Sequence, residues 1–194
     1  MNAVDQTGQG GRGISGIEDA SNLGNVAIKV AQARPVVVSA SFTRPANTTT
    51  YAIGDVITAS PAAAMTFTNV VAANGGSGFI SKVVLHLGEN QSTPLNSQLW
   101  LFDTSPTVPT DNTTPALSDA ESQTMLLNLP LAGPAVTNAT SGAGGNQVII
   151  LDGINYAFGC ATGSRSLYGM LVAANAYTPV ASTPIIVTIT VSPS

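Results

Sequence analysis

The sequence is poor in charge and contains almost none of the side chains on which most enzyme chemistry depends. Charged residues make up 8% of the chain, against roughly 25% in typical soluble domains. His86 is the only histidine and Cys160 is the only cysteine, so Ser-His-Asp triads, Cys-His pairs and zinc sites all lack members. No serine occupies a Gly-x-Ser-x-Gly elbow. We therefore expect neither an enzyme nor a bound cofactor.

The scarcity of charge also excludes several classes of ligand. The six Lys and Arg residues are not clustered, and the net charge is −4, so there is no basic surface for nucleic acid or anionic membrane. The longest apolar runs fall well short of the ~18 residues of a membrane-spanning helix. A single cysteine permits no internal disulfide, and the first six residues do not resemble a signal peptide. These features predict synthesis in a reducing cytoplasm.

Apolar residues, by contrast, make up 44% of the chain, and the mean hydropathy is +0.28. Disordered chains combine low hydropathy with high net charge, which is the reverse of this composition, so the chain should fold. Its surface must be largely neutral and rich in Ser, Thr and Asn. Because a neutral surface keeps a free monomer poorly soluble, we expect part of it to be covered by copies of the chain or by partners.

The first 33 residues differ from the rest and predict an extended N-terminal arm before a domain at 34–194. The segment GQGGRG at 8–13 matches the dinucleotide-binding pattern formally, but neither the preceding strand nor the following helix is present. The arm is too short to bury its own apolar side chains, so it packs on the body, a sister subunit or a partner, unless it is a disordered tail. Candidate partner contacts are Arg12, Ile14 and Ile17.

From Pro35 onward, apolar and polar residues alternate with the period of two that is typical of half-buried strands. Strands are expected at 36–43, 52–58, 65–72, 78–87, 97–103, 124–129, 147–151, 156–159, 166–173 and 184–191. No amphipathic helix is evident. The connections at 104–115 and 130–145 are too long for tight hairpins and suit Greek-key crossovers. The expected fold is all-β, a jelly-roll-like antiparallel sandwich.

Four carboxylates lie close together in sequence, namely Asp103, Asp111, Asp119 and Glu121. Two carboxylates could serve glycoside hydrolysis, and several could bind calcium. Their spacing matches no calcium-loop motif, and polar loops carry acidic residues for solubility alone. Solvated loop residues are the favoured interpretation, and a calcium site stays open.

Two residues are candidates for an interface between subunits. In the strand at 82–87, alternation places His86 outward, where it is either solvated or hydrogen-bonded across an interface. Around Trp100 both faces of the strand are apolar, so both should be covered. The opposite sheet covers one face. The arm, a neighbouring subunit or a long loop of the same chain covers the other.

Two segments resemble a family of structural proteins of tailed-bacteriophage particles. The first, at 41–56, reads SFTRPANTTTYAIGDV, and the second runs from Ile80 through LWLFDTSPTVPTDN at 99–112. The resemblance extends over about 34–191 and supplies no catalytic residues. In physical terms, Pro45 stiffens the exit from the first strand, and Gly54-Asp55 suits a turn or bulge.

The resemblance implies a capsid decoration, or cement, protein that binds the major capsid protein outside the head shell. It also implies a jelly-roll homotrimer at three-fold positions of the virion, made in the cytoplasm of the host bacterium. The alternative is a phage tail or fibre component, or a carbohydrate-binding adhesin. An adhesin needs aromatic rings for sugars, and aromatic residues make up only 5% of this chain.

Overall fold

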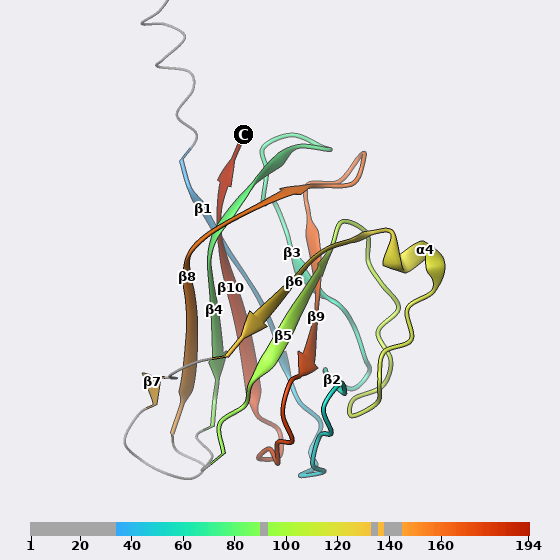
Figure 1. Cartoon of the computed structure of the whole chain (residues 1–194), viewed down its shortest axis with the longest axis vertical. Coiled ribbons are helices and arrows are strands. Elements are labelled where there is room, and N and C mark those ends of the chain that lie inside the picture. The colour runs from blue at the N-terminus through green and yellow to red at the C-terminus, as the bar shows by residue number, and fades with distance from the viewer. Residues whose placement is uncertain (1–33, 90–92, 133–135, 138–144) are drawn as a thin grey trace, which may run out of the picture. The chain divides into compact units, whose positions relative to one another are not determined.

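The alternating segments form two antiparallel β-sheets that pack face to face (Figure 1). The computed structural model describes residues 34–89, 93–132, 136–137 and 145–194, and Pro35–Ser194 is one compact unit. The predicted arm, with Arg12, Ile14 and Ile17, lies outside the described residues. No helix in the described part is long and apolar enough to cross a membrane.

Each sheet has five strands. The first sheet has the order β1-β10-β4-β8-β7, formed by β1 (Val36–Thr43), β10 (Pro184–Pro193), β4 (Ser77–Leu87), β8 (Gln147–Gly159) and β7 (Val136–Thr137). The second has the order β2-β9-β5-β6, formed by β2 (Val56–Ile57), β9 (Leu167–Ala173), β5 (Ser97–Phe102) and β6 (Met125–Leu131), and β3 (Met65–Phe67) also pairs with β9. All of these pairings are antiparallel.

The strand pairs are nested along the chain. The first strand, β1, pairs with the last, β10; β2 and β3 pair with β9, β4 pairs with β8, and β5 pairs with β6. Nesting of this kind results when one long antiparallel hairpin folds over on itself. The predicted all-β antiparallel sandwich is confirmed, with 47% strand and 3% helix.

The core lies between the sheets, and alternation decides which side chains enter it. In β4, Val83, Leu85 and Leu87 are fully buried, whereas the residues between them are only half-buried. In β10, Ile185, Val187 and Ile189 alternate in the same way. Both strands show the period-two alternation that the sequence predicts for half-buried strands.

Several details differ from the sequence-based expectation. The strands expected at 52–58 and 65–72 are shortened to β2 and β3, which are two and three residues long. The strands expected at 147–151 and 156–159 form one strand, β8, because the pair Asp152-Gly153 produces an irregularity within the strand rather than a hairpin turn. Gly153 takes a positive φ of 69° there. The short strand β7 and the one-turn helix α4 (Asp119–Ser122) were not expected. Elements of two and four residues are too short to produce a period in the sequence.

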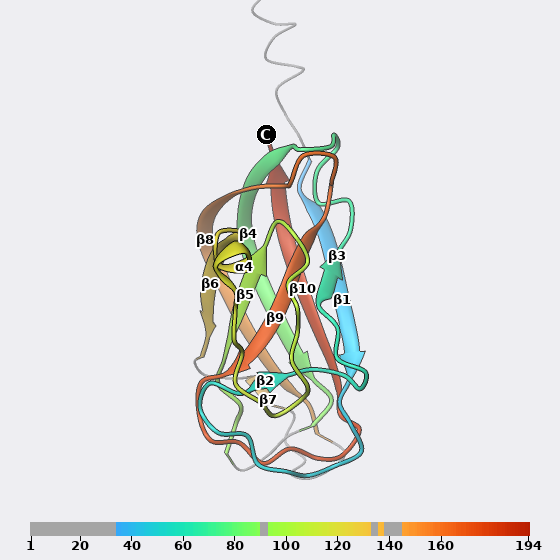
Figure 2. The same ribbon diagram turned by 90° about the vertical axis from the view of Figure 1, so that its right-hand side faces the viewer.

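The outer side of the second sheet is covered by the chain itself. Phe102, Met170 and Val172 are buried there, together with Val56. Side chains of the loop at 103–118 and of neighbouring strands pack on them: Trp100, Val108, Leu117, Met125 and Tyr168. Figure 2 looks onto this side and shows the yellow-green loop passing in front of β5 and β9.

Candidate functional site

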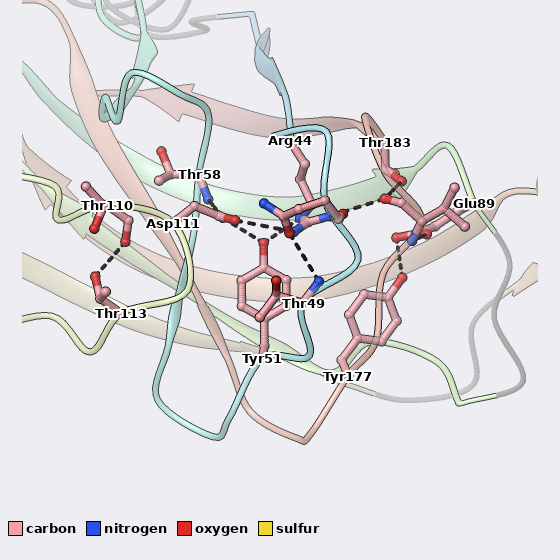
Figure 3. Close-up of polar contacts among 12 residues, drawn as sticks. Arg44, Thr49, Tyr51, Thr58, Glu89, Thr110, Asp111, Thr113, Tyr177 and Thr183 are labelled. Carbon is pink, nitrogen blue, oxygen red and sulfur yellow. Dashed lines mark hydrogen bonds and ion pairs between the residues drawn. The ribbon is translucent and has the colours of Figure 1, made fainter.

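Two segments that the sequence singled out, at 41–56 and 99–112, meet in one buried polar network. Arg44 follows directly after β1, Tyr51 lies in the next loop, and Asp111 belongs to the long loop after β5. Their side chains converge, as Figure 3 shows. We call these three residues, with Tyr177 and Glu89, the Arg44 network.

Arg44 is the centre of the network. Its guanidinium group is almost fully buried and forms an ion pair with Asp111, with 3.3 Å between Nη2 and Oδ2. It also donates from Nε to the Tyr51 hydroxyl and from Nη1 to the Val180 carbonyl at 3.2 Å. The guanidinium carbon lies 4.8 Å from the centre of the Tyr51 ring. Arg44 therefore connects three separate loops, because each partner comes from a different one.

Asp111 accepts hydrogen bonds through both of its carboxylate oxygens. Oδ1 accepts from the Tyr51 hydroxyl at 2.6 Å and from the Thr58 amide at 3.0 Å, while Oδ2 faces Arg44. Only 7% of the Asp111 side chain is exposed. The interpretation of Asp111 as a solvated loop residue is therefore wrong. The reason is a cationic partner 67 positions earlier, which no local pattern indicates.

The loop that carries Asp111 is also held by its backbone. The Asn112 amide donates to the Val56 carbonyl, and the Val56 amide donates to the Thr113 carbonyl, both at 2.9 Å. Just before Val56, the predicted Gly54-Asp55 turn is present, with the Ala52 amide donating to the Asp55 carboxylate at 2.7 Å. The loop over the second sheet is thus fixed both at β2 and at Arg44.

Tyr177 and Glu89 form the other half of the network. Tyr51 and Tyr177 exchange backbone hydrogen bonds of 2.9 and 3.3 Å. The Tyr177 hydroxyl donates to Glu89, which also accepts from the Val180 amide, and the Glu89 side chain is buried. No sequence pattern indicated these two residues, because each follows the end of a strand in an ordinary loop.

Both tyrosines are held in their neutral form. Burial, and then the hydrogen bond donated to Asp111, raises the pKa of Tyr51 far above its usual value of 10. Burial, and then the hydrogen bond to Glu89, raises the pKa of Tyr177 in the same direction. A phenol whose pKa is raised stays protonated near neutral pH, and a protonated phenol is a poor base and a poor nucleophile. The network can hold loops in place, but it offers no activated group.

A hollow of about 390 Å³ opens beside the network. It is lined by Pro45, Asn47, Ala59, Ser60, Pro61, Ala62, Thr110 and Asp111. The one carboxylate in its wall already has three hydrogen-bond donors, so no ionised group there lacks a partner. In the ranges that the structure describes, no three His, Cys, Asp or Glu side chains are grouped to hold a metal ion.

Two other carboxylates of the acidic loop, those of Glu121 and Asp103, have separate local partners, and Asp119 lies in the first turn of α4. Glu121 caps α4: it accepts from the Ser118 hydroxyl at 2.7 Å and from the Thr107 amide at 2.6 Å. Hydrogen bonds from Ser118, and then from Thr107, lower the pKa of Glu121 to about 2. Asp103 accepts from the Thr104 hydroxyl at 2.9 Å. The four residues therefore do not act together as one site.

His86 and Trp100, the two candidates for a subunit interface, lie on different sheets. His86 is on β4 and points outward, as predicted, and its Nδ1 atom is buried without a hydrogen-bond partner. Trp100 is on β5, packs under the loop at 103–118 and donates from its indole nitrogen to Gln98 at 3.0 Å. Cys160 is buried and packs with the core, and burial raises the pKa of its thiol.

Comparison with other proteins adds no relative. The chain matches no known protein-family model and no curated protein sequence.

Proposed function

We propose that the protein is a non-enzymatic structural component of a tailed-bacteriophage particle, a capsid decoration protein that binds the major capsid protein outside the head. It stabilises the shell, and it acts as a jelly-roll homotrimer at three-fold positions. Self-association and attachment to the shell are its only proposed interactions, and the virion exterior is its proposed location.

One observation carries this proposal. The segments that resemble phage structural proteins contribute Arg44, Tyr51 and Asp111. The polar groups of these side chains form hydrogen bonds and an ion pair with one another. A motif that encoded catalysis would leave at least one group facing a substrate. A motif whose polar groups are used internally encodes a rigid arrangement of loops, which is what a protein with a fixed place on a particle needs.

The direct test is copy number. In purified virions that contain the chain, its amount relative to the major capsid protein is measured by quantitative mass spectrometry. A decoration protein at three-fold positions gives a ratio of the same order as one. A few copies per particle would instead indicate a tail or fibre component, and absence from particles would overturn the proposal altogether.

A second test addresses catalysis. Purified protein screened against glycan and peptide substrates should give no turnover above the buffer background. Turnover that persists in Asp103→Asn but is lost in Asp111→Asn would overturn the non-enzymatic assignment. Asp103 is the matched control because it belongs to the same loop region but lies outside the Arg44 network.

A further inference from the structure

The outer side of the first sheet carries a neutral surface of apolar and hydroxyl side chains that no described loop covers. Side chains of β1, β10, β4 and β8 form three registered rows across it, and we call this surface the bare face. The central row is Ser39, Thr188, Val84 and Ile150. Of the six large apolar side chains that are most exposed in the described part, three belong to the bare face: Val37, Ile150 and Ile186.

The bare face carries almost no charge. Its only ammonium group, on Lys82, lies 3.6 Å from its only carboxylate, on Asp152, across the β4–β8 pair. The row that contains His86 has Ile186 and Val148 on either side of it. A second surface of the same composition would therefore meet no repulsion between unpaired like charges.

The edge of the sheet next to the bare face is also open within the described part. β1 pairs with β10 in unbroken register over all eight of its residues. Among the described backbone hydrogen bonds, none joins β1 to a strand on its other side. Edge strands are usually protected by Lys, by Pro or by a bulge, and Val36–Thr43 contains none of these. The open edge therefore extends the bare face.

We infer that the bare face, together with the β1 edge, is the contact between copies of this chain. This inference rests on the proposed function in one respect, because it locates the subunit interface of the oligomer proposed there. A second copy is the occupant because the surface is neutral and partly apolar, and because the same chain supplies both the bare face and the open β1 edge, the two different surfaces that a heterologous contact in a three-fold ring requires. The outer side of the second sheet is already covered by the loop at 103–118 in every copy.

The area is of the right order for such a contact. Four strands about 4.8 Å apart, each contributing about six residues to the three rows at ~3.4 Å per residue, give a flat area of roughly 400 Å². Side-chain relief and the open edge add to this value. A stable interface of standard size uses about 800 Å² from each partner. The bare face is therefore large enough to supply about half of one side of an interface, and the open edge adds to it.

The test is the mass of the purified full chain by light scattering, from about 1 to 100 μM. The wild type should give a multiple of the 19.5 kDa of one chain. Ile150→Asp places a carboxylate in the middle of the bare face and should weaken association at least ~100-fold. Ile53→Asp is the matched control because Ile53 is 73% exposed but lies in the turn before β2, away from the bare face.

A second variant separates loss of association from loss of folding. Ser39→Lys adds a charge at an exposed position of β1 and should also give a folded monomer, with an unchanged circular dichroism spectrum. Wild-type protein that is monomeric up to 100 μM would overturn the inference, and the virion copy number would still test the proposed function. Retention of the wild-type mass by both bare-face variants, or its loss in Ile53→Asp, would overturn the location.

Discussion

The two sheets are similar on their inner sides and differ on their outer sides. Both alternate so that one set of side chains enters the common core. The second sheet then covers its outward apolar residues with the loop at 103–118, which forms a second buried cluster. On the first sheet, Val37, Ile150 and Ile186 stay exposed in the described part. Apolar area on the second sheet therefore contributes to folding of one chain, whereas on the first sheet it is available for association.

Covering a sheet with a loop requires that the loop be fixed. A long loop loses conformational entropy when it is ordered, and apolar contacts alone leave its backbone polar groups to find partners. Here the ion pair from Asp111 to Arg44 and the hydrogen bonds to Val56 supply the fixed points. The comparison predicts that the residues that hold the loop at 103–118, or pack beneath it, determine stability. Residues of the bare face should not.

Arg44→Met should have the largest effect. The change leaves Asp111 buried without its cation, and breaking a buried ion pair from one side costs about 3–5 kcal/mol. Lys82→Met is the control on the bare face. It breaks a pair whose side chains are 37% and 66% exposed, for which at most ~1 kcal/mol is expected. Urea denaturation measures the free energy of unfolding of both variants. Similar losses in Arg44→Met and Lys82→Met would refute the distinction between the covered side and the bare face.

Trp100→Ala should have the next largest effect. Trp100 is half-buried beneath the loop, so the loss should be about 2–3 kcal/mol, below the range for a fully buried aromatic. The mass of the oligomer should not change. Val37→Ala, on a side chain that is 64% exposed, should cost no more than ~0.5 kcal/mol. If Trp100→Ala dissociates the oligomer without loss of stability, the second sheet forms the interface instead.

Much of the fold could be predicted because alternation is a local signal. β1, β4 and β10 have the expected positions and faces. The network could not be predicted, because Arg44 and Asp111 are 67 positions apart and each looks like an ordinary loop residue. The resemblance marked both segments, but it did not indicate that they meet. The cover over Trp100 was one of several open alternatives, since an apolar strand face does not specify what packs on it.

High pH should weaken the covered side through the two buried tyrosines. Their pKa values are raised in the folded state, so their contribution is complete below pH 10 and is lost as the pH rises above 10, where unfolded tyrosines ionise. Linkage predicts that each tyrosine lowers the free energy of unfolding by roughly 1 kcal/mol at pH 10.5. Tyr51→Phe removes one of them, so its stability should fall less between pH 8 and pH 10.5 than that of the wild type. Equal falls would show that Tyr51 ionises normally in the folded protein.

The smallest expected effect concerns Glu121, an exposed residue that holds the loop at 103–118 through the Thr107 amide. Its pKa is lowered to about 2 in the folded state, so its contribution is present above pH 4.5 and is lost as the pH falls from 4.5 towards 2. Protonation removes an acceptor from the Thr107 amide and from Ser118. Hydrogen-exchange protection at Thr107 should therefore decrease over this range, whereas protection in β10 should not. Glu121→Gln should lower protection at Thr107 already at pH 6 and show no further loss on acidification. A decrease in β10 equal to that at Thr107 would indicate global unfolding, and the loop would then not be a separately held cover of the second sheet.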